Sequence, residues 1–291
     1  MRRACRAAAI ASVASAYAAH RIAESRRVAH EPRTYDDGGI DQPRSDAAID
    51  AVAERGYAVT RSLVPPKELE SIKKTDAFRS MPSDSAEPGS DEWRLSAPGR
   101  YHRIHFSDDD VEVFSIVERR LAPYVARFFG LAEEDVLSNH EIYRSELQLL
   151  NAAPKLHEWH PDTKSQIWHS DHRAKGLTLV VPLVDFSPSN GGTQLLPGSH
   201  ALSTAWPALM GGARVATVPA GGLLAYDART YHRGLSNLTE HSRPALVFRY
   251  DRRDERPPPG VGLVGSLLHA SAATALHAMT AMVSAARGEA G

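Results

Sequence analysis

Short β-like runs fill the second half of the chain, and they limit the folds open to it more than any other feature. From residue 139 to residue 251, apolar runs of strand length are separated by Gly, Pro, Asn and Ser. Many short strands divided by turn residues are typical of a β-sandwich or a jelly roll. The sequence therefore predicts a mainly β domain whose core lies in this half of the chain.

Helical patterns flank the β region. A helix is predicted over 45–56, with a short strand after it and a second helix that begins at Pro65. Apolar residues at helical spacing over 108–130 predict a third helix, and the Ala-rich segment 267–288 predicts another near the C-terminus. The expected fold class is thus a β core with N-terminal helices and a C-terminal helix.

The first thirty residues differ in composition from the rest, so residues 1–30 are predicted to be a leader outside the fold. This segment is rich in Arg, Ala and Ser and contains a single acidic residue, as is typical of transit peptides to a mitochondrion or plastid. A secretory signal that ends near residues 16–18 and an untargeted leader on a cytoplasmic protein remain open. We expect a turn-rich linker at 31–44, one functional domain over 45–255, and a C-terminal loop and helix over 256–291.

Charge and cysteine content narrow the possible chemistry. The formal net charge of −1 gives no basic surface that would favour nucleic acid. The sequence contains no run of eighteen apolar residues, so a membrane span is not expected. The chain has one cysteine, Cys5, which rules out an internal disulfide framework and a thiolate metal site. Any metal must therefore be held by His, Asp or Glu, and the 14 histidines are many for this length.

The pair His169 and Asp171 stands just before an apolar, β-branched run. Residues i and i+2 of a strand face the same side, so this imidazole and carboxylate could share one cation with a third ligand from another strand. Two histidines and one carboxylate leave positions of a divalent iron open for a chelating cosubstrate and dioxygen. The other H-x-D pair, His160-Pro161-Asp162, is disfavoured because Pro161 removes a backbone donor. A histidine-rich polar loop without a metal is the alternative interpretation.

Three further features follow this pair in order along the chain. The turn sequence N-G-G-T-x-x-x-P-G-S-H spans 190–200, His232 begins a new strand, and Arg243 follows eleven residues later at the head of an apolar strand. Together with H-S-D at 169–171, these residues resemble the phytanoyl-CoA dioxygenase family of iron(II)/2-oxoglutarate oxygenases. The resemblance extends from about residue 45 to residue 255.

The resemblance implies a double-stranded β-helix, the cupin-like jelly roll of that superfamily. It implies His169, Asp171 and His232 as iron ligands, and Arg243 as the partner of the far carboxylate of 2-oxoglutarate. A guanidinium suits the last role because it is permanently charged and donates in a fork. The expected cofactors are iron(II), 2-oxoglutarate and dioxygen, with ascorbate as an assisting reductant.

The expected reaction hydroxylates a C–H bond of a small-molecule substrate, a lipid-derived acyl group or a secondary metabolite, and releases succinate and carbon dioxide. Halogenating relatives replace the carboxylate ligand by a small residue, and Asp171 is present here, so hydroxylation is favoured. Two other classes stay open. One is a zinc-dependent cupin-like hydrolase with the same ligands, and the other is a non-catalytic binding protein that kept the barrel.

One position departs from the family pattern. Relatives often carry a hydroxyl residue two positions after the distal histidine, where it helps the arginine to hold the cosubstrate, and this chain has Gly234 there. A water or another hydroxyl, for which Thr178 is the candidate, is expected to take its place. Gln148 and Asn151, on the strand before the metal pair, are expected near the cosubstrate because other members use amides there.

Overall fold

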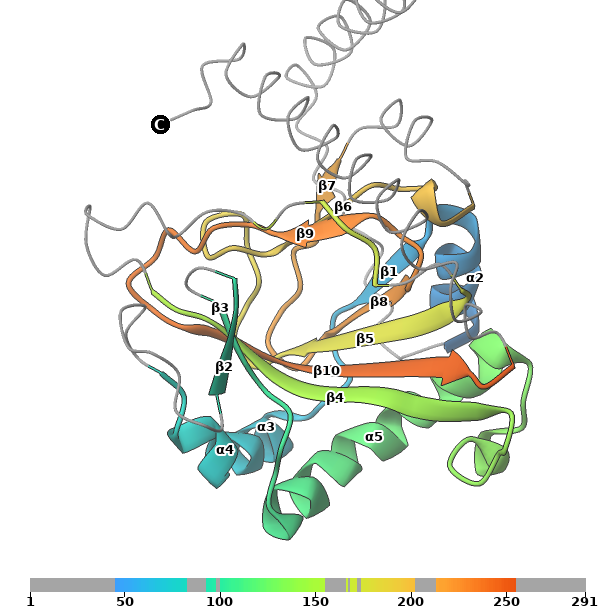
Figure 1. Cartoon of the computed structure of the whole chain (residues 1–291), viewed down its shortest axis with the longest axis horizontal. Helices are drawn as coiled ribbons and strands as arrows, with labels where there is room; N and C mark the ends of the chain where they lie inside the picture. The colour runs from blue at the N-terminus through green and yellow to red at the C-terminus, as the bar shows by residue number, and fades with distance from the viewer. Residues whose placement is uncertain are drawn as a thin grey trace, which may run out of the picture. The chain divides into compact units, whose positions relative to one another are not determined.

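Two antiparallel sheets form the core of this computed structural model, which describes residues 45–82, 93–97, 100–154, 166, 168–171, 174–201 and 213–254. Within these residues the larger sheet has the order β1-β8-β5-β10-β4-β3-β2 and the smaller one the order β7-β6-β9 (Figure 1). The strands are β1 (Tyr57–Thr60), β2 (Trp93–Ala97), β3 (Arg100–Arg103), β4 (Ile142–Ala152), β5 (Gly176–Pro182), β6 (Thr193–Leu195), β7 (Arg214–Val215), β8 (Leu223–Asp227), β9 (His232–Gly234) and β10 (Arg243–Arg252). The mainly β, jelly-roll fold class is confirmed.

The two faces of β10 show why its middle, residues 244–248, is continuously apolar. β10 lies between β4 and β5 in the middle of the larger sheet. Ala245 and Val247 pack toward the smaller sheet, whereas Leu246 and Phe248 belong to the core beneath the helices. Because both faces are buried, the strand reads as a continuous hydrophobic run rather than an alternating one.

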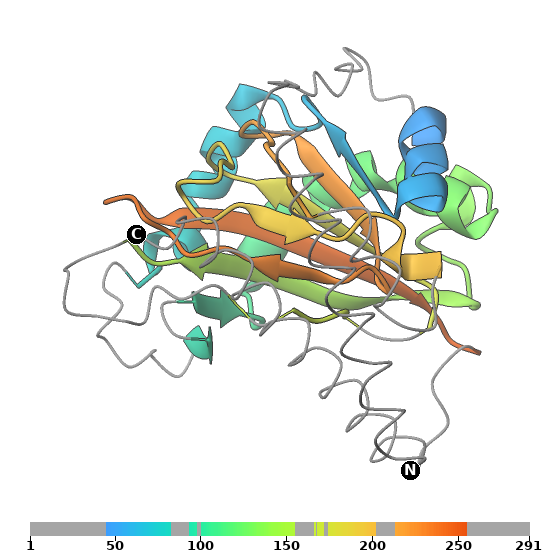
Figure 2. The same ribbon diagram turned by 90° about the horizontal axis from the view of Figure 1, so that it is seen from above.

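Helices cover the face of the larger sheet that points away from the smaller sheet. They are α2 (Ser45–Arg55), α3 (Pro66–Lys73), α4 (Asp76–Arg79) and α5 (Asp108–Phe129), with 3₁₀ turns at Glu133–Asp135 and Ser199–Ala201. Figure 2 shows α2 beside β1 at one edge of the sheet. The helices predicted over 45–56, after Pro65 and over 108–130 are confirmed. The predicted leader, linker and C-terminal helix lie outside the described residues.

Helix α5 carries the packing between the helical layer and the sheet. Ser107 accepts a hydrogen bond from the Asp110 amide at 3.2 Å, and the Asp110 carboxylate accepts one from the Ser107 amide at 3.4 Å, so a capping box begins the helix. Gly130, in the left-handed conformation with φ 73°, ends it. Fully buried Phe114 and Leu121 face the core at helical spacing.

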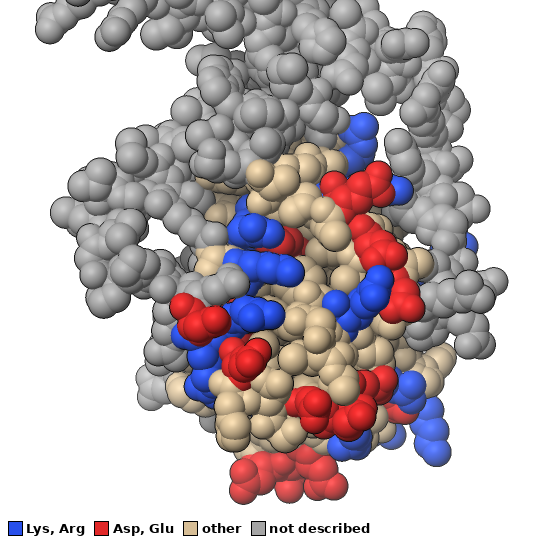
Figure 3. Space-filling view, turned by 90° about the vertical axis from the view of Figure 1, so that its right-hand side faces the viewer, with Lys and Arg blue, Asp and Glu red and all other residues tan. Residues whose placement is uncertain are grey.

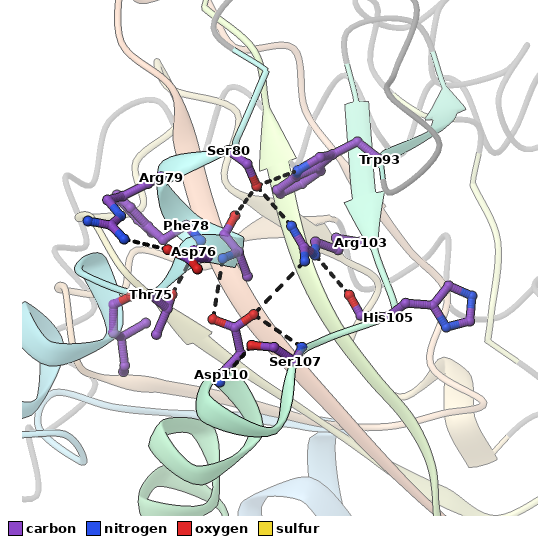
Figure 4. Close-up of polar contacts among 12 residues, drawn as sticks. Thr75, Asp76, Phe78, Arg79, Ser80, Trp93, Arg103, His105, Ser107 and Asp110 are labelled. Atoms are coloured by element: carbon purple, nitrogen blue, oxygen red, sulfur yellow. Dashed lines mark hydrogen bonds and ion pairs between the residues drawn. The ribbon is translucent and has the colours of Figure 1, made fainter.

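A buried polar cluster fastens the β2–β3 edge to the helical layer (Figure 4). Arg103 of β3 donates to Ser80 Oγ at 2.9 Å, and the indole of Trp93 of β2 donates to the same oxygen at 3.3 Å. The Asp110 carboxylate accepts the Ala77 amide at 3.3 Å and lies 4.0 Å from the Arg103 guanidinium. The cluster therefore joins β2 and β3 to α4 and to the start of α5, which fixes how strand β3 enters the sheet.

Charged side chains of both signs are intermixed on the face that Figure 3 shows. On the helices, exposed pairs such as Arg127–Asp50 at 3.1 Å and Arg120–Glu68 at 2.6 Å link one element to the next. Pairs of this kind contribute little individually, so the apolar layers hold the fold together. No helix among the described residues is both long and apolar enough to cross a bilayer.

We expect Asp110→Ala to lower the free energy of unfolding by about 2–4 kcal/mol, because it removes a helix cap and leaves buried donors without their acceptor. Asp109→Ala is the matched control, since Asp109 lies in the same helical turn but is exposed. Its cost should stay below about 1 kcal/mol. Urea unfolding followed by circular dichroism measures both. Equal losses in the two variants would contradict a structural role for the buried cluster.

Candidate metal centre

His169 and His232 lie directly opposite each other in an antiparallel bridge. The His169 amide donates to the His232 carbonyl at 3.0 Å, and the His232 amide donates back to the His169 carbonyl at 2.8 Å. Residues that exchange both hydrogen bonds in this way point their side chains to the same face. The two imidazole centroids are accordingly 4.4 Å apart.

Asp171 completes the group from two residues further along. Its amide donates to the Ala228 carbonyl at 2.9 Å, so the segment that carries His169 stays in contact with the segment that leads to His232. One ligand atom from each of His169, Asp171 and His232 lies within 4.8 Å of the other two. His232 is buried and the other two are half-buried. The structure thus brings together the three residues that the sequence predicted as metal ligands.

Neighbouring groups orient two of these side chains. His232 Nδ1 lies 3.0 Å from the Thr230 carbonyl oxygen, which can only accept, so Nδ1 is the donor and, in the neutral tautomer, Nε2 is left with the lone pair that a metal needs. Nε2 is 3.5 Å from Asp171 Oδ1. The Thr178 hydroxyl donates to the other oxygen, Asp171 Oδ2, at 2.6 Å. Such outer contacts fix the orientation and basicity of metal ligands.

A row of polar residues runs across the sheet beneath this group. Tyr226, Thr178, Arg249 and Glu146 are register partners on β8, β5, β10 and β4, so their side chains share the face that looks toward the smaller sheet. Arg249 forms an ion pair with Glu146 at 2.8 Å and a second with Asp251 at 3.4 Å. Its charge is therefore balanced inside the protein.

Arg243 lies on the same face of β10, six residues from Arg249, but in a different electrostatic setting. Its guanidinium carbon is 4.4 Å from the centroid of the Phe186 ring, and its Nε has no hydrogen-bond partner. Among the described residues no carboxylate forms an ion pair with it. Burial, and then the charge of Arg100, hold the pKa of Arg243 well below its usual value. A buried, uncompensated cation is costly, so this position favours an anionic ligand.

The remaining predicted site residues divide between the two faces of the sheet. Gln148 is the register partner of Val247 and lies on the inner face, as expected. Asn151 is three residues further along β4 and so faces the helices, where its amide donates to the Pro82 carbonyl at 3.0 Å. The structure therefore places Asn151 on the face opposite to Gln148, away from the inner face on which it was expected. Thr178 contacts Asp171 and not the surroundings of Gly234, so it does not take the place of the missing hydroxyl.

Two residues near the site were not predicted from the sequence. The Tyr226 hydroxyl lies 3.3 Å from His232 Nε2, and burial, with the nearby charge of Asp171, raises the pKa of this phenol well above its usual value. The Arg100 guanidinium lies against Gly234. Alternation along the strand at 223–227 could have placed Tyr226 on the inner face. Nothing local marks Arg100, because its position depends on the pairing of β3 with β4.

Comparison with known proteins agrees with this geometry. The sequence profile of the family described as phytanoyl-CoA dioxygenase matches residues 52–245. Ectoine dioxygenase from Halomonas elongata is 26% identical over 260 residues, which cover 74% of this chain and 72% of the relative.

Solved structures share the fold. AviO1 from Streptomyces viridochromogenes superposes with a TM-score of 0.57 at 20% identity, over 73% of this chain and 97% of its own. The epimerase SnoN, solved with Fe³⁺, alpha ketoglutarate and nogalamycin RO, gives a TM-score of 0.53 at 18% identity, over 71% of this chain and 82% of its own.

We expect Asp171→Ala to weaken binding of iron(II) by more than about 100-fold, because loss of a direct ligand exceeds the 10- to 100-fold cost of losing an outer partner. Asp162→Ala is the matched control from the competing H-x-D pair, which lies outside the described residues, and it should bind iron as the wild type does. Anaerobic titration with iron(II), or with cobalt(II) as a coloured substitute, measures both. Loss of iron binding in Asp162→Ala but not in Asp171→Ala would show that the pair His160 and Asp162, and not His169 and Asp171, holds the metal.

Proposed function

The chain belongs to the phytanoyl-CoA dioxygenase family, and we propose that it hydroxylates a C–H bond of a small-molecule substrate with iron(II), 2-oxoglutarate and dioxygen, releasing succinate and carbon dioxide. Family membership places it among the iron(II)/2-oxoglutarate-dependent dioxygenases. The observation that carries the proposal is the presence, between the two sheets, of a His-Asp-His group and of a buried cation, Arg243, for which the described residues provide no counter-charge. The first suits the metal and the second suits the dicarboxylate.

The donor set fits iron. Two imidazole nitrogens and one carboxylate oxygen, without sulfur, are the ligands of non-haem iron(II) oxygenases, and they leave coordination positions free. When bound, the iron and the 2-oxoglutarate supply the oxidising power for the reaction. His169, Asp171 and His232 would hold the metal. The Thr178 hydroxyl donates a hydrogen bond to Asp171 Oδ2 at 2.6 Å, which orients the carboxylate and leaves Oδ1 for the metal. The preset geometry lowers the cost of ordering the ligands on binding.

Arg243 is the group best placed to bind the far carboxylate of 2-oxoglutarate. Its planar guanidinium can donate two parallel hydrogen bonds to a carboxylate, and it stays charged in an apolar setting. Arg249 on the same face is less suited, because Glu146 and Asp251 already occupy its donors. The anion would restore the counter-charge that the described residues do not provide at Arg243.

Apolar side chains line the inner face between the metal group and Arg243. Val180, Leu224, Ala245 and Val247 belong to one buried cluster that joins the two sheets. Such a lining excludes water, and electrostatic contacts are stronger where water is absent. A dicarboxylate could therefore lie between the sheets in an environment with little water, with one end on the metal group and the far carboxylate on Arg243.

The retained carboxylate at Asp171 supports hydroxylation, because halogenating relatives lack it. The curated relative is named ectoine dioxygenase, which supports a small metabolite as the substrate. We assign the substrate class as a lipid-derived acyl group or a secondary metabolite.

The proposal is tested by incubating the purified full chain with iron(II), ascorbate, 2-oxoglutarate and a panel of small metabolites and acyl-CoA esters. The expected result is succinate formation coupled to a product that has gained one oxygen atom. Zinc(II) in place of iron(II) should give no turnover. Turnover with zinc, without succinate, would identify a hydrolase and overturn the assignment.

We expect Arg243→Ala to weaken 2-oxoglutarate binding by about 2–5 kcal/mol, or roughly 30- to several-thousand-fold, because the anion loses its charge-assisted partner. Arg243→Lys should recover only part of this loss, since an ammonium cannot donate in a bidentate fork. Iron affinity should not change in either variant. Calorimetric titration of the metal and of 2-oxoglutarate into each protein measures both constants. Unchanged 2-oxoglutarate binding in Arg243→Ala would move the anchor to Arg249.

A further inference from the structure

Arg243 has a second arginine beside it in the sheet. Strand β4 lies between β10 and β3, and its residue Ala152 is the register partner of Arg243 on one side and of Arg100 on the other. Residues directly opposite each other across antiparallel strands point to the same face. Arg100, Ala152 and Arg243 therefore form a row on the inner face, in which the small side chain of Ala152 leaves room for the two long ones to converge above it.

The Arg100 guanidinium occupies the space beside Gly234. A Cβ atom added at Gly234 would lie 2.5 Å from Nη1, 2.6 Å from Cζ and 2.8 Å from Nη2 of Arg100. These distances are well inside van der Waals contact, so a side chain at 234 and the present position of Arg100 exclude each other. Nη2 of Arg100 also donates to the Leu235 carbonyl, which holds the guanidinium next to β9. The absence of a side chain at Gly234 thus leaves the space that the Arg100 guanidinium occupies.

We propose that Arg100 and Arg243 together bind the far carboxylate of 2-oxoglutarate, and that Arg100 replaces the hydroxyl that relatives carry two positions after the distal histidine. This inference rests on the proposed function and names a specificity-determining residue for the same site. Gly234 is then needed because any side chain there would displace the Arg100 guanidinium, which supplies the hydrogen bonds that a hydroxyl at this position would otherwise donate.

The electrostatics of the pair agree with an anionic occupant. Both guanidiniums are buried, burial lowers the pKa of Arg100 to about 10, and the charge of Arg100 contributes to the lowered pKa of Arg243. Two like charges held close together in a poorly solvated place repel each other. A carboxylate has two oxygens with about four acceptor sites, so it can accept from both guanidiniums and offset that repulsion.

The opposite face of β3 explains how Arg100 is held in place. Side chains alternate along a strand, so Arg103 faces the helices when Arg100 faces the barrel. Arg103 is fixed in the buried polar cluster with Ser80 and Asp110 (Figure 4). Tyr101, which faces the same way as Arg103, is fully buried. The anchored outer face sets the direction in which Arg100 enters the site.

The test compares binding of 2-oxoglutarate with binding of 2-oxopentanoate, which has the same chain length but lacks the far carboxylate. Both are titrated anaerobically into the iron(II)-loaded full chain by calorimetry. For Arg100→Ala we expect 2-oxoglutarate to bind about 10- to 150-fold more weakly, the range for one hydrogen bond to a charged group. Binding of 2-oxopentanoate should not change, because the contact it would lose is absent. Arg100→Lys should restore part of the preference.

Substitutions at Gly234 test the exclusion directly. Gly234→Ser alone should weaken 2-oxoglutarate binding, because the new side chain displaces the Arg100 guanidinium. In the Arg100→Ala background the same Gly234→Ser change should instead strengthen binding, since the serine hydroxyl then has room to donate to the carboxylate. Such a reversal of sign marks two residues that share one space and one ligand. Weakening of similar size in both backgrounds would overturn the proposal.

Arg103→Met is the matched control, since it removes a buried arginine from the same strand on the opposite face. It should lower the urea midpoint of unfolding and leave the preference for 2-oxoglutarate over 2-oxopentanoate intact. Equal weakening of both ligands in Arg100→Ala would show a merely structural role and overturn the inference. Unchanged binding of both ligands in Arg100→Ala would overturn the inference as well. In that case a wild type that still prefers 2-oxoglutarate over 2-oxopentanoate would leave the proposed function standing. A wild type without any such preference would instead contradict the proposed function.

Discussion

The pair of backbone hydrogen bonds between His169 and His232 is the contact on which the site depends. The two residues are 63 positions apart in the sequence, and this bridge makes their imidazoles face the same way. Two residues further along, the Asp171 amide donates to the Ala228 carbonyl of the same neighbouring segment. A shift of one residue in this pairing would turn the side chains of one segment to the opposite face and separate His232 from His169 and Asp171. The metal group is thus a consequence of strand pairing and not of local sequence alone.

The inner face of the larger sheet separates two kinds of buried charge. Beneath the metal group, Arg249 is balanced by Glu146 and Asp251 within the protein. At the other end of β10, Arg243 has no such partner among the described residues, and the charge of Arg100 is close enough to oppose it. A protein can retain an unbalanced buried cation when a ligand supplies the counter-charge. The contrast between two arginines on one strand face therefore supports the proposed position of the ligand more strongly than either residue does alone.

The sequence predicted those features that depend on short-range rules. The helix over 108–130 followed from apolar spacing and a terminal glycine, and His169, Asp171, His232 and Arg243 followed from one strand alternation and a family resemblance. Asn151 was misplaced because a strand inverts its faces at each residue, and the register of β4 could not be read from its own composition. Arg100 was missed because its position depends on the pairing of β3 with β4, about fifty residues later in the chain.

Two buried arginines whose charges oppose each other also affect the thermodynamics of the whole fold. Their repulsion is present only in the native state, because an unfolded chain hydrates both guanidiniums, so the empty protein folds against a penalty. A bound dicarboxylate removes that penalty and adds stability that grows with the logarithm of its concentration above the dissociation constant. The fraction of folded protein is thereby linked to the concentration of 2-oxoglutarate. The melting temperature then reports how much cosubstrate is bound, even when no substrate is turned over.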